Sequence, residues 1–253
     1  MSDEVTHFFS KISACFFLFF WYNFIMIFIY SEKAGEKELK LEGESFTHIF
    51  KARRTQLGEI LELRNLKDNF SYFYKVVEVK KKEAVLELQE KKEKPQKNKK
   101  NFHLLWCVVD IKTIKEALPY LNQVGVSKIS FLYCERSQKS FKINLEKLEK
   151  ILIQSSEQCG RWDLMKLGVY KSLEDFQKKN DEEIFLLDFG GRKISDLDMK
   201  KKEKITTVLV GPEGGISKKE REKFSSEKII SFDTDLVLKS ETACVSLASK
   251  ILL

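Results

Sequence analysis

The sequence predicts an α/β protein in which a mostly parallel sheet follows a small all-β domain. Three observations lead to this prediction. Between residues 27 and 90, short runs of β-forming residues alternate with turns. From residue 102 onward, apolar strands alternate with helical segments, an order typical of a parallel sheet. A lysine-rich stretch at residues 91–101 separates the two patterns.

The composition excludes several classes of protein. The chain has 253 residues, of which 43% are hydrophobic and 33% are charged, so it can bury a core in one or two domains. With only 11 Gly and 3 Pro, collagen-like and low-complexity chains are excluded. The net charge of +7 permits a nucleic-acid partner without requiring one.

The first 25 residues differ from the rest of the chain. Residues 14–30 form a nearly unbroken apolar run, slightly short for a membrane-spanning helix. The start carries Asp3 and Glu4, and no A-x-A follows, unlike a secretory signal. We expect the fold to start at Met26, with residues 1–25 as an extension or a misassigned start. A membrane anchor is the alternative, but a membrane partner is not expected.

The small domain is predicted over residues 26–92. Alternating or clustered β-formers indicate strands at 60–63, 70–79 and 84–88, with one short helix at 45–51. These elements fit a compact β-barrel-like domain. The following stretch, KKEKPQKNKKN, has six lysines against one glutamate. We interpret residues 93–101 as a basic linker, which is either only solvated or also contacts phosphates and adds to the salt dependence of RNA binding.

The larger domain is predicted over residues 102–253. Its strands are expected at 102–109, 126–133, 183–189, 206–210 and 229–232. Its helices are expected at 112–123, from a cap at Asn144 to Cys159, from a capping box at Ser217 to Glu220 onward, and at 242–252.

Cysteine and histidine spacing argues against disulfide and zinc frameworks. The five cysteines are widely spaced without a C-x-x-C pair, a pattern that suits reduced thiols in a cytosolic protein. The three histidines lack any zinc-binding spacing, so no metal is expected. There is no G-x-S-x-G, and an esterase-type serine therefore has no support in the sequence.

The segment VLVGPEGGISKKE at residues 208–220 carries the most information about function. A buried strand ends in a glycine-rich turn, and a capped helix follows. Glycines let the backbone approach a ligand closely, and ligands of open α/β sheets bind beyond the carboxyl ends of the strands. The segment is neither a P-loop nor a dinucleotide turn. Taken alone, it is either a binding turn or only a tight structural turn.

Together with the tail DLVLKSETACVSLA at residues 235–248, this turn resembles the SPOUT methyltransferases. More narrowly, the chain resembles the 16S rRNA (uracil-N3) methyltransferase family, RsmE. The segments that match this family are E-Q-C-G-R at 157–161, C-E-R-S at 134–137, V-G-V at 124–126 and HIFKARRTQLG at 48–58. The resemblance covers residues 26–253, with the motifs in the right order.

The resemblance implies a PUA-like β-barrel followed by a SPOUT domain with a trefoil knot. It implies S-adenosylmethionine as methyl donor, bound by three loops in the knot. The expected cofactor-binding residues are Leu187, Gly211, Pro212, Glu213, Gly214, Gly215, Leu236, Leu238, Thr242 and Ala243. It further implies a cytoplasmic homodimer that acts on 16S rRNA, within the small ribosomal subunit.

The chemistry that the family implies requires N3 of uracil to lose its proton. A site for this reaction must favour an anion on the base. We nominate Arg161, with Arg136 second, to stabilise that anion, and Glu213 as a base or as a residue that orients the loop. The RNA-binding residues expected in the small domain are Lys51, Arg53 and Arg54.

Two departures from the family pattern put single contacts in doubt. The family has L-R-T-E-T-A where this chain has L-K-S-E-T-A, so Lys239 keeps the charge but loses the bidentate fork of arginine. Residues 110–113 lack the usual K-G-x-R-M. Two alternatives also stay open, namely a SPOUT enzyme for tRNA or 23S rRNA and a non-catalytic RNA-binding relative.

Overall fold

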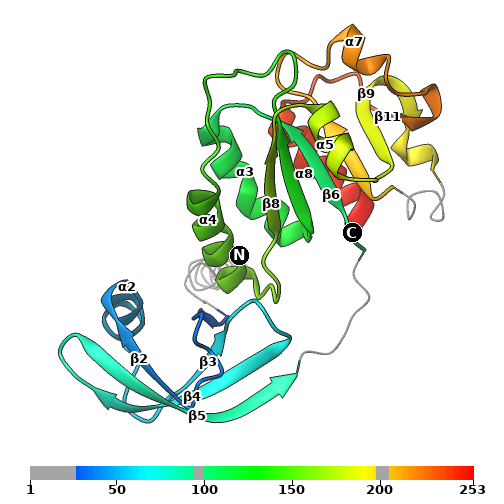
Figure 1. The fold of residues 1–253 in the computed structure, drawn as a ribbon. Coiled ribbons are helices and arrows are strands. Elements are labelled where there is room, and N and C mark those ends of the chain that lie inside the picture. The colour runs from blue at the N-terminus through cyan, green and yellow to red at the C-terminus, as the bar shows by residue number, and fades with distance from the viewer. Residues whose placement is uncertain (1–26, 94–99, 198–204) are drawn as a thin grey trace, which may run out of the picture. The chain divides into compact units, whose positions relative to one another are not determined.

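The computed structural model describes residues 27–93, 100–197 and 205–253. The chain packs into two compact units (Figure 1). The first unit contains the described residues up to 93 together with residues 157–162, and the second contains the rest. The predictions for residues 1–25 and for most of the linker lie outside the described residues. In the described part of the chain, no helix is long and apolar enough to cross a membrane.

The first unit is built on a five-stranded sheet in the order β1-β3-β4-β5-β2. Its strands are β1 (Ile29–Tyr30), β2 (Glu38–Glu42), β3 (Ile60–Arg64), β4 (Phe70–Val79) and β5 (Glu83–Glu93). β1 and β3 are parallel, and the other pairs are antiparallel. The predicted strands at 60–63, 70–79 and 84–88 are therefore confirmed.

Alternation of side chains explains the core of this unit. In β2 the two leucines, Leu39 and Leu41, are buried while the charged residues between them are exposed, as the two-residue period of a strand requires. The fully buried Tyr74 fixes the segment before β2. Its hydroxyl donates to the carbonyl of Glu36 at 2.7 Å and accepts from the N–H of Gly35 at 2.9 Å.

The helix predicted at 45–51 is present as two short pieces, α2 (Gly43–Phe46) and the π-helix η1 (Thr47–Ala52). The last strand of this unit runs further than the predicted 84–88. Lys91 and Lys92 belong to β5 and pair with Tyr72 and Ser71 of β4, because β4 supplies backbone partners that composition alone does not reveal.

The second unit is built on a six-stranded, entirely parallel sheet in the order β11-β9-β10-β6-β7-β8. Its strands are β6 (His103–Cys107), β7 (Lys128–Leu132), β8 (Lys166–Tyr170), β9 (Ile184–Lys193), β10 (Thr207–Val210) and β11 (Ile229–Ser231). The helices are α3 (Ile111–Val124), α4 (Leu145–Cys159), α5 (Leu173–Lys179), α7 (Lys218–Arg221) and α8 (Ser240–Leu252), with 3₁₀ turns η2 (Ile194–Asp196) and η3 (Ser226–Lys228).

Each face of this sheet has its own core. On one face, Leu104 and Trp106 of β6 belong to the cluster that includes buried residues of α3, α4 and α8. On the other face, Leu105 and Cys107 belong to the cluster that includes α5. Successive side chains of a strand point to opposite faces. A sheet covered on both faces needs such continuous apolar strands.

Most elements of this unit agree with the predictions. For example, Asn144 caps α4 as expected, since its Oδ1 accepts from the N–H of Lys147 at 2.9 Å. There are three differences. The sequence missed β8 and α5, because β8 is an edge strand of mixed exposure without a strong apolar run. The closing helix starts at Ser240 rather than at residue 242. The trefoil knot and the domain boundaries from the sequence stay predictions.

Candidate active site

A cavity of about 420 Å³ lies in the second unit where the pairing of β9 and β10 ends. Its wall comes from three segments of the chain, at 187–193, 210–216 and 231–243. The carboxyl ends of parallel strands are the usual ligand-binding edge of an open α/β sheet. The cavity therefore lies where the fold favours a ligand.

Eight of the ten predicted cofactor-binding residues line this cavity. They are Leu187, Gly211, Pro212, Glu213, Gly215, Leu236, Leu238 and Ala243. The other two lie elsewhere. Gly214 faces Arg136, whose Cβ is 3.6 Å from the place where a Gly214 side chain would start. Thr242 lines a separate shallow hollow between α3 and α8. The stretch after Leu187 was expected as one of the three loops, although Asp188, Phe189 and Lys193 were not named individually. The 231–235 segment of the wall was not expected.

The turn from Gly211 to Gly215 favours glycine at both ends. A Cβ on Gly211 would lie 3.3 Å from the backbone carbon of Gly215, so a side chain would crowd the turn. Gly215 has φ +70°, a left-handed conformation that favours glycine. Its N–H donates to the carbonyl of Pro212 at 2.8 Å and closes the turn.

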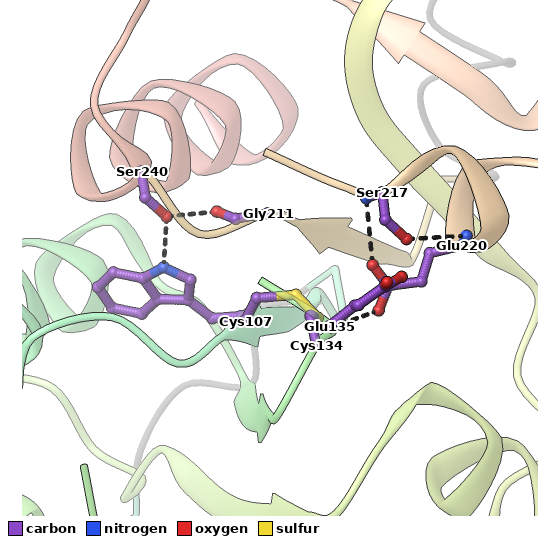
Figure 2. The surroundings of a disulfide bond; sticks show 8 residues. Cys107, Cys134, Glu135, Gly211, Ser217, Glu220 and Ser240 are labelled. Carbon is purple, nitrogen blue, oxygen red and sulfur yellow. Dashed lines mark hydrogen bonds between the residues drawn. A yellow bond between two sulfur atoms is a disulfide. The ribbon is translucent and has the colours of Figure 1, made fainter. Parts of the chain in front are cut away.

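Side chains from neighbouring elements hold both ends of this turn. At the first end, the hydroxyl of Ser240 donates to the carbonyl of Gly211 at 2.6 Å (Figure 2). The indole N–H of Trp106 donates to the same hydroxyl at 2.9 Å. Near the other end, Arg136 Nη1 donates to the carbonyl of Gly214 at 2.7 Å. The predicted site residue Arg136 thus contacts the turn directly.

The helix after the turn begins with the predicted capping box. Ser217 and Glu220 exchange side-chain to backbone hydrogen bonds at 3.3 and 3.2 Å. The Glu220 carboxylate also accepts from the N–H of Glu135 at 2.9 Å (Figure 2). The C-E-R-S segment after β7 is therefore bonded to the turn and to the helix that follows it.

The expectation of reduced thiols was wrong for one pair. Cys107 and Cys134 form a disulfide with their Cα atoms 5.7 Å apart (Figure 2). They lie 27 residues apart in the sequence, but β6 and β7 pair in parallel register so that Cys107 is opposite Leu132. Strand pairing brings the two sulfurs together, and sequence spacing could not indicate this. Cys244 is a buried free thiol.

The charges around the cavity are mainly acidic. Asp188, Glu213, Asp233 and Asp235 line it together with a single lysine, Lys193, among the described residues. Lys193 forms an ion pair with Asp233 at 2.6 Å, and this contact raises the pKa of the lysine. Arg221 pairs with Asp188. The remaining negative charge favours a ligand that carries positive charge.

Arg161, the first nominated arginine, is buried and packs with the first unit. The segment around it is held by Arg64. The Arg64 guanidinium lies 3.7 Å from the centre of a Trp162 ring and donates to the carbonyl of Gly160 at 3.0 Å. The Glu157 carboxylate accepts from the N–H of Tyr30 at 2.7 Å. The structure therefore does not group Arg161 in the same compact unit as Arg136 and Glu213.

The predicted RNA-binding residues lie together at the end of the π-helix. Lys51, Arg53 and Arg54 are all exposed. Arg54 has φ +59°, an uncommon backbone conformation for a residue other than glycine. Short π-helical turns and strained residues are often found at functional sites. The local backbone is therefore compatible with a binding role for this cluster.

A second constellation resembles a hydrolase triad but has no access to substrate. His103 Nδ1 lies 2.6 Å from Glu182 Oε2, and its Nε2 lies 2.8 Å from the hydroxyl of Ser130. Ser130 has no exposed surface, and His103 begins β6 at the edge opposite the cavity. We interpret this group as a structural network. In the described residues, no cluster of His, Cys, Asp and Glu could hold a metal ion.

Comparison with known proteins identifies the family. Residues 95–252 match the RNA methyltransferase domain, and residues 41–89 match the RNA methyltransferase PUA domain. Together, a parallel sheet with this cavity and a PUA domain define the class of RNA methyltransferases. A ribosomal RNA small subunit methyltransferase E from Helicobacter pylori is 43% identical over 228 residues, covering 88% of this chain and 98% of that protein. The chain belongs to the ribosomal RNA small subunit methyltransferase E family.

Two solved structures share the fold. A Neisseria gonorrhoeae ribosomal RNA small subunit methyltransferase E bound to S-adenosylmethionine has a TM-score of 0.70 at 17% identity, covering 87% of this chain and 94% of that chain. A Legionella pneumophila protein in complex with the same cofactor has a TM-score of 0.73 at 24% identity, covering 90% and 97%. The resemblance inferred from the sequence motifs is confirmed.

Proposed function

We propose that this protein transfers the methyl group of S-adenosylmethionine to N3 of a specific uracil in 16S rRNA of the small ribosomal subunit. The observation that carries the proposal is the cavity itself, because three separate segments, two of which contain the family motifs, form its wall at the carboxyl edge of the sheet. Because the chain belongs to a family of ribosomal RNA methyltransferases, we assign methyl transfer to this cavity.

The residues around the cavity fit S-adenosylmethionine. The cofactor carries a sulfonium and an ammonium group against one carboxylate, and the acidic groups of the wall, among them Glu213 and Asp235, suit that net positive charge. Apolar side chains such as Leu187 and Leu238 suit its adenosine part. Two proteins of the same fold were solved with this cofactor bound. When bound, it supplies a methyl group that a nucleophile can accept.

The side chains must create the nucleophile. Uracil N3 carries a proton, and the anion left by its departure places charge on the neighbouring carbonyl oxygens. We assign stabilisation of this charge to Arg161 and Arg136, since preorganised cationic donors act where charge develops. Glu213 lines the cavity and is exposed, so it is either the proton acceptor or a residue that orients the turn.

The RNA and protein partners follow from the same assignment. Lys51, Arg53 and Arg54 would bind phosphates, which position RNA without reading its sequence. We propose a homodimer in the cytoplasm. Exposed apolar side chains at the cavity, Phe189, Leu236 and Val237, are of the kind that an interface covers.

The decisive test is transfer of labelled methyl groups. The full chain is incubated with labelled S-adenosylmethionine and small ribosomal subunits that lack their native modification. The expected product after digestion is labelled 3-methyluridine. The same reaction is run with tRNA and with 23S rRNA, and label in either of them would instead indicate a different target. Cofactor binding without label in any RNA would favour a non-catalytic relative, and the control is a reaction without subunits.

A further inference from the structure

We propose that Ser240 is a positioning residue for the cofactor, because its hydroxyl fixes the carbonyl of Gly211 and thereby the shape of the turn from Gly211 to Gly215. The inference rests on the proposed function and deepens it. It assigns a role to a side chain that lies in the L-K-S-E-T-A motif but is not among the expected cofactor-binding or catalytic residues.

The direction of the hydrogen bonds at Ser240 is fixed. An indole nitrogen can only donate, and a hydroxyl has a single proton. Because Trp106 Nε1 donates to the hydroxyl at 2.9 Å, the hydroxyl proton is available for the carbonyl of Gly211 at 2.6 Å. Trp106 has no exposed surface and Ser240 is 5% exposed, so water does not compete for these contacts.

Gly211 is the residue at which such a constraint has an effect. It has no side chain, so its backbone is freer than that of any other residue type, and it follows directly on β10. The next residue, Pro212, has no N–H that could fix the peptide plane between them. The carbonyl of Gly211 is therefore the polar group through which this plane can be held, and Ser240 holds it.

The hydroxyl also joins two walls of the cavity. Gly211 belongs to the 210–216 segment, whereas Ser240 begins α8 and belongs to the 231–243 segment. Trp106 anchors both to the middle of the sheet, since β6 pairs with β10 and β7. Loss of the hydroxyl would free the first residue of the turn and separate the two walls that the ligand must contact together.

A purely structural role predicts a different result. If the hydroxyl served only to satisfy the buried indole N–H, its loss would lower the thermal stability and leave the affinity for S-adenosylmethionine unchanged. A positioning role predicts weaker binding of the cofactor with little change in the KM for RNA. The two roles are separated by measuring cofactor affinity and unfolding temperature on the same variants.

The experiment is calorimetric titration of the full chain with S-adenosylmethionine. Ser240→Ala is expected to weaken binding about 5- to 30-fold, the cost of ordering the backbone of one freed residue when the cofactor binds, while Ser240→Thr keeps the hydroxyl and should bind as the unaltered chain does. Ser249→Ala is the matched control. It removes another hydroxyl of α8, which bonds only to the carbonyl of Val245 within its own helix.

The outcomes separate the inference from the proposed function. Absence of cofactor binding by the unaltered chain overturns both. If the unaltered chain binds the cofactor and Ser240→Ala binds it with the same affinity, the inference alone is overturned. Should Ser240→Ala fail to fold, Ser240→Val and Ser240→Thr have the same shape and differ in the hydroxyl. Equal affinity of these two variants overturns the inference, and weaker binding by the valine variant supports it.

Discussion

His103 illustrates how single residues of this protein are adapted to their surroundings. It lies between Glu182 and Ser130, and Glu182 also accepts from the hydroxyl of Thr207 at 2.7 Å. Burial lowers the pKa of His103, although Glu182 opposes this effect. Burial would raise the pKa of Glu182, but hydrogen bonds from Thr207 and His103 outweigh it, and the pKa is lowered. The network is built for a neutral ring beside a charged carboxylate.

Stability should therefore fall on acidification in two steps. With both pKa values lowered, the folded state binds fewer protons than the unfolded chain. His103 contributes its full stability above its ordinary value of 6.5 and loses it as the pH falls below that value. Glu182 contributes its full stability above its ordinary value of 4.5 and loses it as the pH falls below that value. Urea unfolding between pH 8 and about pH 2 would measure both steps. In His103→Gln the upper step should disappear, and its persistence would contradict this assignment.

The nominated role of Arg161 also leads to a prediction at this scale. Arg161→Lys keeps the charge but loses the planar fork of donors. We expect kcat for methyl transfer to fall about 10- to 100-fold, a loss somewhat below that for removing an entire donor. The affinity for S-adenosylmethionine should not change. Single-turnover kinetics and calorimetry would measure the two quantities, with the unfolding temperature as the control for folding. An unchanged kcat would remove Arg161 from the mechanism.

At the scale of elements, the ends of β6 and β7 support the turn from Gly211 to Gly215. Trp106 and Cys107 are the last two residues of β6. Cys134 lies two residues after the end of β7, and the next two residues bond to α7 and to Gly214. The disulfide joins the two strand ends covalently (Figure 2). A bridge at this place constrains both anchors of the turn.

Loss of the bridge should lower stability. The closed loop spans 27 residues, for which the chain-entropy relation gives about 3–4 kcal/mol. Cys134→Ser should lower the free energy of unfolding by about this amount under non-reducing conditions, whereas under reducing conditions the variant and the unaltered chain should differ little. Alkylation of the unfolded, unreduced protein followed by mass spectrometry is the direct check. Modification of Cys107 and Cys134 would show that no bridge exists.

At the scale of the whole molecule, RNA binding and cofactor binding are assigned to different compact units. The exposed cluster of Lys51, Arg53 and Arg54 belongs to the first unit, and the cavity belongs to the second. Such a division lets phosphate contacts supply affinity while another surface selects the base. It also allows the two properties to be measured separately.

Removal of the basic cluster should weaken RNA binding without affecting the cofactor. Each phosphate that the protein no longer neutralises should reduce the slope of log affinity against log salt by about 0.7–0.9. The triple alanine variant of Lys51, Arg53 and Arg54 should therefore show a slope smaller by about 2–3 in filter binding at several salt concentrations. Lys178→Ala, an exposed lysine of α5, is the control. An unchanged slope would exclude the cluster from the RNA interface.

The sequence by itself determined most elements and the identity of the site. Alternating and apolar runs give β3 to β5 and the parallel strands other than β8, because burial on one or both faces imposes these patterns. Caps at Asn144 and Ser217 were predictable because their hydrogen bonds are local. The glycine-rich turn and the tail identified the family because both motifs are continuous in the chain.

The tertiary structure alone decided what depends on contacts between distant segments. Pairing of β6 with β7 brings Cys107 to Cys134, and the start of α8 brings Ser240 to Gly211. Packing also groups Arg161 with the first unit, although its sequence lies between elements of the second. Local patterns record burial and capping, which act over a few residues. Register and long-range packing are set by the whole chain, and no pattern at one position contains them.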